Sequence, residues 1–532
     1  MMRRILLCLS LVFGYCSPLK VLVYSPAFAA SHSNFMARIA DSLTEAGHNA
    51  TYFMPIVDES RRNQLGVKVT RDVIVVEQDQ EMKSQIVPID EMMKLFWTMD
   101  VTSSNAERVL ETFHKVSVLS CGNIFRNKEA LEELKSRDFD VVITEPLQSC
   151  GFALAKFLGI DKVIMSSSCV NYDILIPTTG EPEDTSYLPG MASQVTDQMT
   201  FTQRLENYEV FHVMRTAFAN MFDDEARMYR KYLGEDFPDW RQLIPDASLH
   251  LVNSIPYIDF PRPTIQKTIP IGGVSVDMEK IFAEKLSPEL DEILDRRLFN
   301  MFISFGTLAK STEMPDEFKR NLLSVIRSEP NVTFIWKYES DDVAFVEGVE
   351  NVEFMKWAPQ TTILKDKRLT AFLGHGGLGS TNEAAYLGKP AIMIPIFADQ
   401  SRNANMLARQ GMVIAFHKRD LANIDKIRTA FQSVLYDKKL HLAAEKIAQM
   451  LQNQPLKPKE LVVKYIEFVG KYGPFPKMTP YSLKMPWYQR YNYDIHAYRA
   501  AQYLLIPISL CLVKVLLTKL SVNLVSKKKK VE

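Results

Sequence analysis

A glycine-rich turn in the C-terminal half of the chain has the residue types that could bind an anion. Residues 369–390 read LTAFLGHGGLGSTNEAAYLGKP, and the pattern predicts a buried strand that ends at His375 and a helix that begins near Ser380. Gly376 and Gly377 allow a ligand to approach the backbone, and free amides at the positive end of a helix favour a phosphate. A tight strand-to-helix turn without a ligand explains the same residues equally well, because the segment is neither a P-loop nor a dinucleotide-binding fingerprint.

Alternating strands and helices are predicted to hold this turn in place. Residues 20–25 (KVLVYS) are typical of a buried strand, and apolar residues at every fourth position from Phe35 predict a helix that has Ser33 or Asn34 as its N-cap and stops at Gly47. A strand, a helix and a further strand in this order indicate a parallel sheet. The other predicted strands are 51–54, 139–144, 162–166, 301–305, 332–338, 369–374 and 390–397, and the other helices are 151–158, 315–328, 401–410, 424–436 and 438–452.

The length of 532 residues and the interrupted alternation predict two domains. The fold class is α/β, with two Rossmann-like doubly wound domains that face each other across a cleft. The segment 173–246 is more helical and is expected to carry an acceptor-binding insertion. The predicted parts are a signal peptide 1–16, a first domain 17–255, a proline-rich linker 256–273, a second domain 274–455, a helical segment 456–499 that packs back toward the first domain, a transmembrane helix 500–525 and a lysine-rich tail 526–532.

The net charge of zero is a sum over unlike parts of the chain. Residues 1–16 and 503–532 hold eight of the 63 basic side chains and one of the 63 acidic ones, so the remainder carries a net charge of about −7, and no basic domain is present to bind nucleic acid. Arg3 and Arg4 before an apolar run predict a secretory signal peptide. The apolar residues from 500, followed by lysines, favour a single-pass type I anchor over a buried helix. Lys529 and Lys530 resemble a dilysine retrieval signal of the endoplasmic reticulum, although they could simply stop transfer.

Cysteines and sequons agree with a luminal body. Cys121, Cys150 and Cys169 are an odd number without metal-ligand spacing, so at most one internal bridge can form. Asn49 and Asn331 begin sequons that could carry glycans, although such tripeptides are common by chance.

The run from Trp357 to Gly411 resembles the donor-binding signature of the UDP-glucuronosyltransferase family. Its Trp-x-Pro-Gln start, His-Gly-Gly turn, helix glutamate and Asp-Gln end all occur here, and the resemblance extends over nearly the whole chain. It implies two Rossmann-like domains (GT-B), with the UDP-sugar donor held by the second and the acceptor by the first. The UDP-sugar is a co-substrate, and neither a cofactor nor a metal is expected.

The resemblance also implies roles for individual residues. Trp357 would stack on uracil, Gln360 would bind its edge, and Glu383 would bind the ribose hydroxyls. His375, the amides of Gly376 and Gly377, and Thr307 would hold the diphosphate, while Asp399 and Gln400 would bind the sugar. Gly379 stands where the family often has Asn, which puts one polar contact in doubt.

The same resemblance points to His32 as the general base. An alcohol has a pKa far above neutrality, so its attack on the sugar needs a positioned base. His32 is predicted in the loop after the first strand, and Glu145, which ends the strand 139–144 at the same sheet edge, could orient it. Taken alone, His32 could be a solvated loop residue. The common acid of the family is Asp, one methylene shorter than Glu145.

These assignments predict an inverting transfer of a sugar, foremost glucuronic acid, to a hydroxyl of a small lipophilic acceptor in the manner of a detoxifying enzyme. A glucosyltransferase of the same fold is the alternative within enzymes. A non-catalytic membrane-anchored binder of lipophilic ligands is the alternative from another class. The expected location is the membrane of the endoplasmic reticulum with the body in the lumen, and a homo-oligomer is possible.

Overall fold

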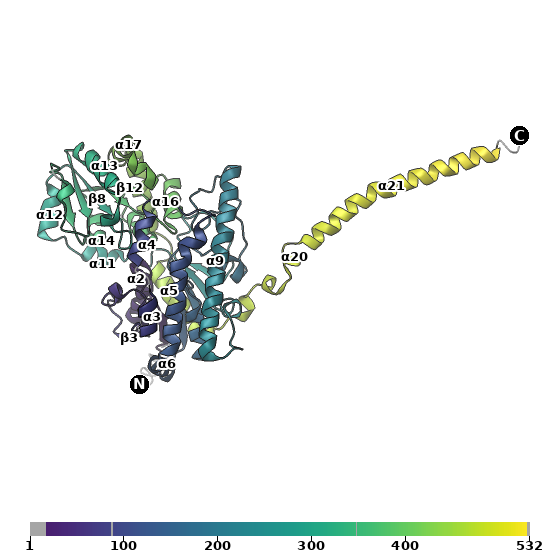
Figure 1. The fold of residues 1–532 in the computed structure, drawn as a ribbon, viewed down its shortest axis with the longest axis horizontal. Coiled ribbons are helices and arrows are strands. Elements are labelled where there is room, and N and C mark those ends of the chain that lie inside the picture. Colours follow the sequence, from purple (N-terminus) through teal and green to yellow (C-terminus); the bar gives the residue numbers. More distant parts are fainter. Residues whose placement is uncertain (1–16, 87–88, 347, 529–532) are drawn as a thin grey trace, which may run out of the picture. The chain divides into compact units, whose positions relative to one another are not determined.

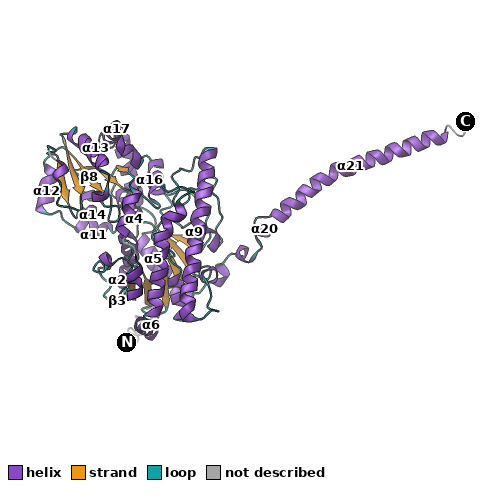
Figure 2. Ribbon diagram, viewed as in Figure 1, coloured by secondary structure: helices purple, strands orange, loops and turns teal. Residues whose placement is uncertain are grey.

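The computed structural model describes residues 17–86, 89–346 and 348–528, so the predicted signal peptide and the last four residues lie outside the described part. Residues 17–478 form one compact unit and residues 479–528 a second one. The first unit contains two parallel sheets flanked by helices (Figures 1 and 2), as the sequence predicts. Their apolar, β-branched strands are buried on both faces, which is the pattern of a parallel sheet covered by helices.

The first sheet has the strand order β3-β2-β1-β4-β5-β6-β7, with every pairing parallel. Its strands are β1 (Lys20–Tyr24), β2 (Asn49–Pro55), β3 (Asp72–Val76), β4 (Val141–Thr144), β5 (Val163–Ser167), β6 (Leu249–Val252) and β7 (Thr268–Pro270). The order reverses between β1 and β4, which creates a crevice at the carboxyl ends of these two strands.

The second sheet repeats this order as β10-β9-β8-β11-β12-β13, again with parallel pairings. Its strands are β8 (Phe299–Ser304), β9 (Val332–Lys337), β10 (Val352–Met355), β11 (Leu369–Gly374), β12 (Ala391–Met393) and β13 (Val413–Ala415). Here the order reverses between β8 and β11, so each sheet has one switch point.

The helices fall into three groups along the chain. Those between the strands of the first sheet are α2 (Ala30–Glu45), α3 (Gln80–Gln85), α4 (Ile89–Phe96), α5 (Ala106–Arg126), α6 (Lys128–Ser136), α7 (Cys150–Phe157), α8 (Leu175–Thr179), α9 (Phe201–Leu233) and α10 (Trp240–Leu243). Those of the second half are α11 (Met278–Ala283), α12 (Pro288–Asp295), α13 (Asp316–Arg327), α14 (Gln360–Lys365), α15 (Leu378–Tyr386), α16 (Gln400–Arg409), α17 (Ile424–Tyr436) and α18 (Lys438–Gln452). The C-terminal ones are α19 (Pro458–Tyr472), α20 (Trp487–Arg490) and α21 (Tyr493–Lys528).

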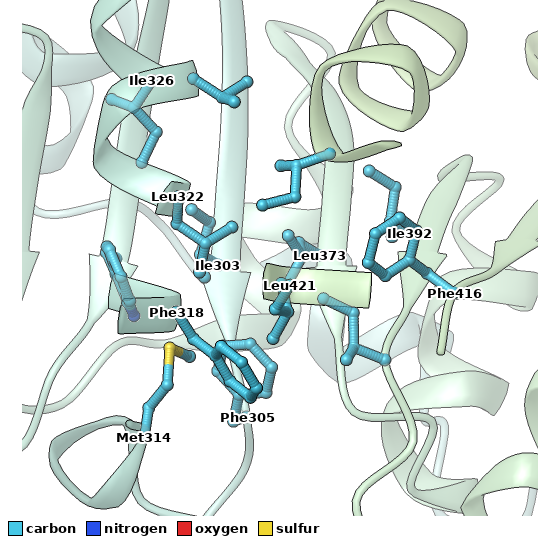
Figure 3. Packing of buried hydrophobic residues seen from close by; sticks show 14 of the residues in the cluster. Ile303, Phe305, Met314, Phe318, Leu322, Ile326, Leu373, Ile392, Phe416 and Leu421 are labelled. Carbon is cyan, nitrogen blue, oxygen red and sulfur yellow. The ribbon is translucent and has the colours of Figure 1, made fainter. Parts of the chain in front are cut away.

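Each face of each sheet is covered by an apolar cluster. One cluster of the second sheet packs Ile303 and Leu373 of the strands against Leu322 of α13 (Figure 3). The same cluster contains Phe96 and Trp97 at the end of α4, although this segment lies between strands of the first sheet. Lys418 fixes the contact, because its Nζ donates to the carbonyls of Phe96 at 2.7 Å, Met99 at 2.6 Å and Ile396 at 2.9 Å.

The sequence patterns do not predict five of the described strands, β3, β6, β7, β10 and β13. Several predicted boundaries also differ from the structure. Helix α2 begins at Ala30 and has no side-chain cap, so Ser33 and Asn34 lie inside the helix and the predicted N-cap is wrong. Of the predicted strand 390–397, only Ala391–Met393 (β12) is a strand. The predicted linker 256–273 contains β7, which joins the edge of the first sheet.

The C-terminal segment divides between the two units. Helix α19 packs on the first sheet domain through Val462, Ile466 and Val469, and His48 Nε2 lies 3.1 Å from Glu467 Oε1. The second unit contains α21, whose span Tyr493–Leu524 is the one described helix that is long and apolar enough to cross a membrane.

Candidate active site

The predicted site residues lie after the strands that flank the two switch points. His32 follows β1, and Glu145 directly follows β4. In the second sheet, Thr307 follows β8 and His375 directly follows β11. Ligands of doubly wound folds bind in the crevices at such points, so the topology alone brings both groups to binding positions.

His32 and Glu145 are in direct contact. His32 Nδ1 lies 2.7 Å from Glu145 Oε1, across 113 residues of sequence. His32 is the third residue of α2, so the prediction that it lies in a loop is wrong. The ring of Phe28 packs against the imidazole, with 4.6 Å between the ring centroids. Glu145, despite its extra methylene, therefore reaches the histidine.

The contact moves the two pKa values in opposite directions. Burial alone would lower the pKa of His32, but the Glu145 carboxylate, together with the Cys169 sulfur 3.8 Å from Nε2, holds it well above the usual range. Burial alone would raise the pKa of Glu145, yet the contacts with His32 and Ser168 hold it below its usual range. Glu145 thus stays ionised and fixes a proton on Nδ1, which leaves Nε2 as the basic atom.

Gly377, in the glycine-rich turn between β11 and α15, and Gly306, which follows β8, pack tightly around His375. A Cβ on Gly377 would lie 2.5 Å from His375 Nε2, and one on Gly306 would lie 2.7 Å from its Cε1. Gly376 has φ +81° and its Cβ would lie 2.8 Å from the Gln400 carbonyl. Burial, with the nearby Lys337, lowers the pKa of His375 to about 4. Its Nδ1 is buried without a hydrogen-bond partner, so the neutral ring can hydrogen-bond a ligand.

The residues predicted to hold the nucleoside lie on α14 and α15. Gln360 Nε2 donates to Glu383 Oε2 at 2.6 Å and to Ser380 Oγ at 2.9 Å. Burial raises the pKa of Glu383 to about 7. Trp357 is 70% exposed and leaves its ring faces accessible for stacking.

Thr307 and Gly379 have open surroundings. Thr307 is exposed in the turn after β8. A Cβ added to Gly379 in the first turn of α15 meets no atom within 4 Å, so the position has room for the Asn that the family often has.

Asp399 and Gln400 stand at the start of α16 and are buried. Gln400 Oε1 accepts from the amides of Ile396 at 2.8 Å and Phe397 at 3.1 Å, so only its amide group remains to bind a sugar. Burial raises the pKa of Asp399, and His32 and Arg402 lower it in part. The preceding Ala398 has φ +55°, a strained conformation of the kind that clusters at ligand sites.

Sequence reasoning missed three side chains that hold this site together. Ser168 and Tyr172 both donate to Glu145 Oε1, Tyr172 at 3.2 Å. Asn403 Nδ2 donates to the Gly376 carbonyl at 3.1 Å and to Asp399 Oδ2 at 3.0 Å. Ser168 could have been found, because it follows β5 at the same sheet edge as Glu145.

Of the three body cysteines, Cys121 and Cys150 form a disulfide and Cys169 is free, which confirms the prediction of at most one bridge. The disulfide joins α5 to the first residue of α7, five residues beyond Glu145. Asn49 and Asn331 are exposed. Within the described ranges, no group of three His, Cys, Asp or Glu side chains is placed to hold a metal.

Comparison with known proteins identifies relatives over the whole length. A Caenorhabditis elegans protein named as a UDP-glucuronosyltransferase (ugt-46) is 26% identical over 515 residues, which covers 93% of each chain. Mouse UDP-glucuronosyltransferase 1A9 is 24% identical over 495 residues, covering 92% of this chain and 90% of its own. Named relatives of this kind are glycosyltransferases.

Solved glycosyltransferases share the fold. Phytolacca americana UGT2, complexed with UDP-2fluoro-glucose and pterostilbene, superposes with a TM-score of 0.55 at 15% identity, over 85% of this chain and 99% of its own. Os79 from O. sativa has a TM-score of 0.58 at 15% identity, and the match covers 85% of this chain and 100% of Os79. These likenesses establish the GT-B arrangement of two parallel sheets.

The sequence model described as "UDP-glucoronosyl and UDP-glucosyl transferase" matches residues 19–531. The two switch-point sites, the relatives and this match together establish that the chain is a glycosyltransferase that uses a UDP-sugar donor and belongs to the UDP-glucoronosyl and UDP-glucosyl transferase family.

Proposed function

We propose that this enzyme transfers glucuronic acid from its UDP ester to a hydroxyl of a small lipophilic acceptor, with inversion at the anomeric carbon. The observation that carries the proposal is the His32–Glu145 pair, at 2.7 Å between Nδ1 and Oε1, in electrostatic contact with Asp399 at the predicted sugar position. A base directed at the sugar is what a direct displacement needs.

In this mechanism His32 Nε2 removes the acceptor proton as the acceptor oxygen attacks the anomeric carbon. UDP leaves from the opposite face, so the configuration inverts. The charge that develops on the diphosphate is stabilised by the amides of Gly376 and Gly377 and by the positive end of α15. His375 is neutral at physiological pH because its pKa is about 4, so it contributes a hydrogen bond rather than a charge.

The proposal also specifies which sugar the UDP donor carries. Support for glucuronic acid comes from the names of the relatives, ugt-46 and mouse 1A9. UDP-glucose is the second candidate, favoured by the charges around Asp399. The cations acting on that carboxylate are His32 and Arg402, and Arg402 already pairs with Asp259 at 2.6 Å. A neutral sugar needs no further cation.

The proposed location is the membrane of the endoplasmic reticulum, with α21 as a type I anchor and the body in the lumen. Exposed aromatic side chains lie before and at the start of the apolar stretch of α21: Tyr481, Trp487, Tyr488, Tyr491, Tyr493, Tyr498 and Tyr503. Tyr and Trp favour the membrane–water interface, so they support a membrane boundary at this end of the apolar stretch.

A donor screen tests the proposed function. The full-length protein in membranes is incubated with a small phenol and, separately, UDP-glucuronate, UDP-glucose, UDP-galactose and UDP-N-acetylglucosamine. UDP release and the mass of the conjugate are measured. Preferred turnover of UDP-glucuronate supports the proposal, and preferred turnover of UDP-glucose replaces it with the second candidate. Binding of the phenol without UDP release from any donor supports the non-catalytic binder instead.

A further inference from the structure

Ser168 lies between the two members of the base pair. It is the first residue after β5, the neighbour of β4 in the sheet, and it is buried. Its hydroxyl donates to Glu145 Oε1, and its backbone amide lies 3.3 Å from the same oxygen. Its Oγ also lies 2.6 Å from His32 Nδ1. One serine therefore contacts both partners.

The protons of this arrangement can be assigned. The hydroxyl proton of Ser168 points to the carboxylate, so the lone pairs of Oγ are free to accept. The single Nδ1 proton of His32 is then shared between Glu145 Oε1 at 2.7 Å and Ser168 Oγ at 2.6 Å. Two acceptors on one side of the ring fix the tautomer, so that in the neutral ring Nε2 is the atom without a proton.

The contact between Ser168 and Glu145 matters because Glu145 has one methylene more than an aspartate. A glutamate has one more rotatable bond than an aspartate, so its carboxylate needs more contacts to stay at a fixed position. Three donors converge on Glu145 Oε1: the backbone amide and the hydroxyl of Ser168, and the Tyr172 hydroxyl at 3.2 Å. The Ser168 backbone is itself held, because Asn253 Nδ2 donates to its carbonyl at 2.7 Å.

We propose that Ser168 is a positioning residue for the general base, which holds the Glu145 carboxylate against His32 and shares the Nδ1 proton. This inference rests on the proposed function, in which His32 is the base. The titratable groups around the imidazole are Glu145, Tyr172 and Cys169 of the first sheet domain and Asp399 of the second.

A matched pair of variants separates the hydroxyl from the shape of the side chain. Ser168→Thr keeps the hydroxyl, whereas Ser168→Val has the same branched shape without it. In the full-length protein, we expect Ser168→Val and Ser168→Ala to lower kcat roughly tenfold, as for the loss of one hydrogen bond to a charged group. Ser168→Thr is expected to retain more activity than Ser168→Val, and the KM for the UDP-sugar should be unchanged in all three.

The pH profile distinguishes positioning from a general loss of structure. Loosening the carboxylate weakens its effect on His32, so the midpoint of the acid limb of kcat/KM should move to lower pH in Ser168→Ala and Ser168→Val. Equal kcat for the Thr and Val variants together with an unshifted midpoint would overturn the inference.

A direct titration of His32 tests the role of Ser168 independently of whether the proposed function is correct. The Cε1 resonance of 13C-labelled histidine, assigned with His32→Gln, should titrate at lower pH in Ser168→Ala than in the wild type. A wild-type protein that turns over no UDP-sugar refutes the proposed function, whereas an unchanged His32 titration in Ser168→Ala refutes the role of Ser168.

Discussion

Asn382 Nδ2 donates to Asn253 Oδ1 at 3.2 Å, and this bond joins the helix of the donor site to the sheet that carries the base. Asn382 precedes Glu383 on α15, and Asn253 follows β6. Because Asn253 also holds the Ser168 carbonyl, a continuous row of buried hydrogen bonds connects the two halves of the site.

Because of this connection, replacing either asparagine by alanine should destabilise the protein. Asn253→Ala leaves a carbonyl and an amide buried without partners, which should lower the free energy of unfolding by about 1–3 kcal/mol. Unfolding in denaturant measures it, and a double-mutant cycle with Asn382→Ala should give a coupling energy above about 0.5 kcal/mol. Additive effects of the two changes would contradict the connection.

Removal of the base should abolish transfer without loss of donor binding. His32→Ala is expected to lower kcat by about 10²–10⁴-fold, the usual contribution of general base catalysis. Glu145→Ala should have a milder effect because the imidazole remains. UDP affinity, measured by calorimetry, should stay at the wild-type value in both, and retained turnover in His32→Ala would rule out this base.

The raised pKa of His32 predicts the pH dependence. A general base acts when unprotonated, so activity must rise with pH as His32 loses its proton. Since Glu145 and Cys169 hold the pKa of His32 well above 6.5, the midpoint of the rise in kcat/KM should lie above that value. Glu145→Gln removes the negative partner, and the midpoint should then move down. A midpoint that is the same in both proteins would assign the limb to another group.

Donor binding should weaken as the pH falls through about 7. Burial raises the pKa of Glu383 to about 7, and in its predicted ribose-binding role the carboxylate would accept hydroxyl groups best when ionised. Below that pH it gains a proton and loses acceptor capacity, so the Kd for UDP should rise. Glu383→Gln should bind UDP more weakly at pH 8 and show little change between pH 6 and 8. A dependence of equal slope in the variant would exclude Glu383 as its source.

Gly379→Asn should be tolerated and should strengthen donor binding. A Cβ at this position meets no atom within 4 Å, and an amide in the first turn of α15 can reach a phosphate or sugar oxygen. Replacing Gly by Asn also favours the helix, by only about 0.3 kcal/mol because Asn is itself a poor helix former. We expect a lower KM for the donor and an equal or higher melting temperature. Gly379→Ala is the control for the helix effect alone.

Reduction of the Cys121–Cys150 disulfide should destabilise the first sheet domain. The bond closes a loop with a sequence separation of 29 residues, for which about 2–4 kcal/mol of stabilisation is typical. The double variant Cys121→Ser/Cys150→Ser should unfold at lower denaturant concentration than the wild type, and Cys169→Ser should not. Equal stability of all three under oxidising conditions would contradict this.

Sequence patterns predicted eight of the thirteen described strands, each of them a short apolar run, and missed β3, β6, β7, β10 and β13. They also predicted the turn between β11 and α15, because its glycines are consecutive. Ser168 was missed because its contact with Glu145 depends on the order of β4 and β5, which no local pattern records. The start of α2 was misplaced because Ala29 gives no cap signal.

The segment after α4 limits how the cleft between the two sheets can open. Phe96 and Trp97 are buried in the core of the second sheet, and Lys418 holds three carbonyls there. Pulling the halves apart at this edge would expose Phe96 and Trp97 to water and break the hydrogen bonds of Lys418, both of which cost stability. This contact therefore opposes separation of the two sheets at this edge.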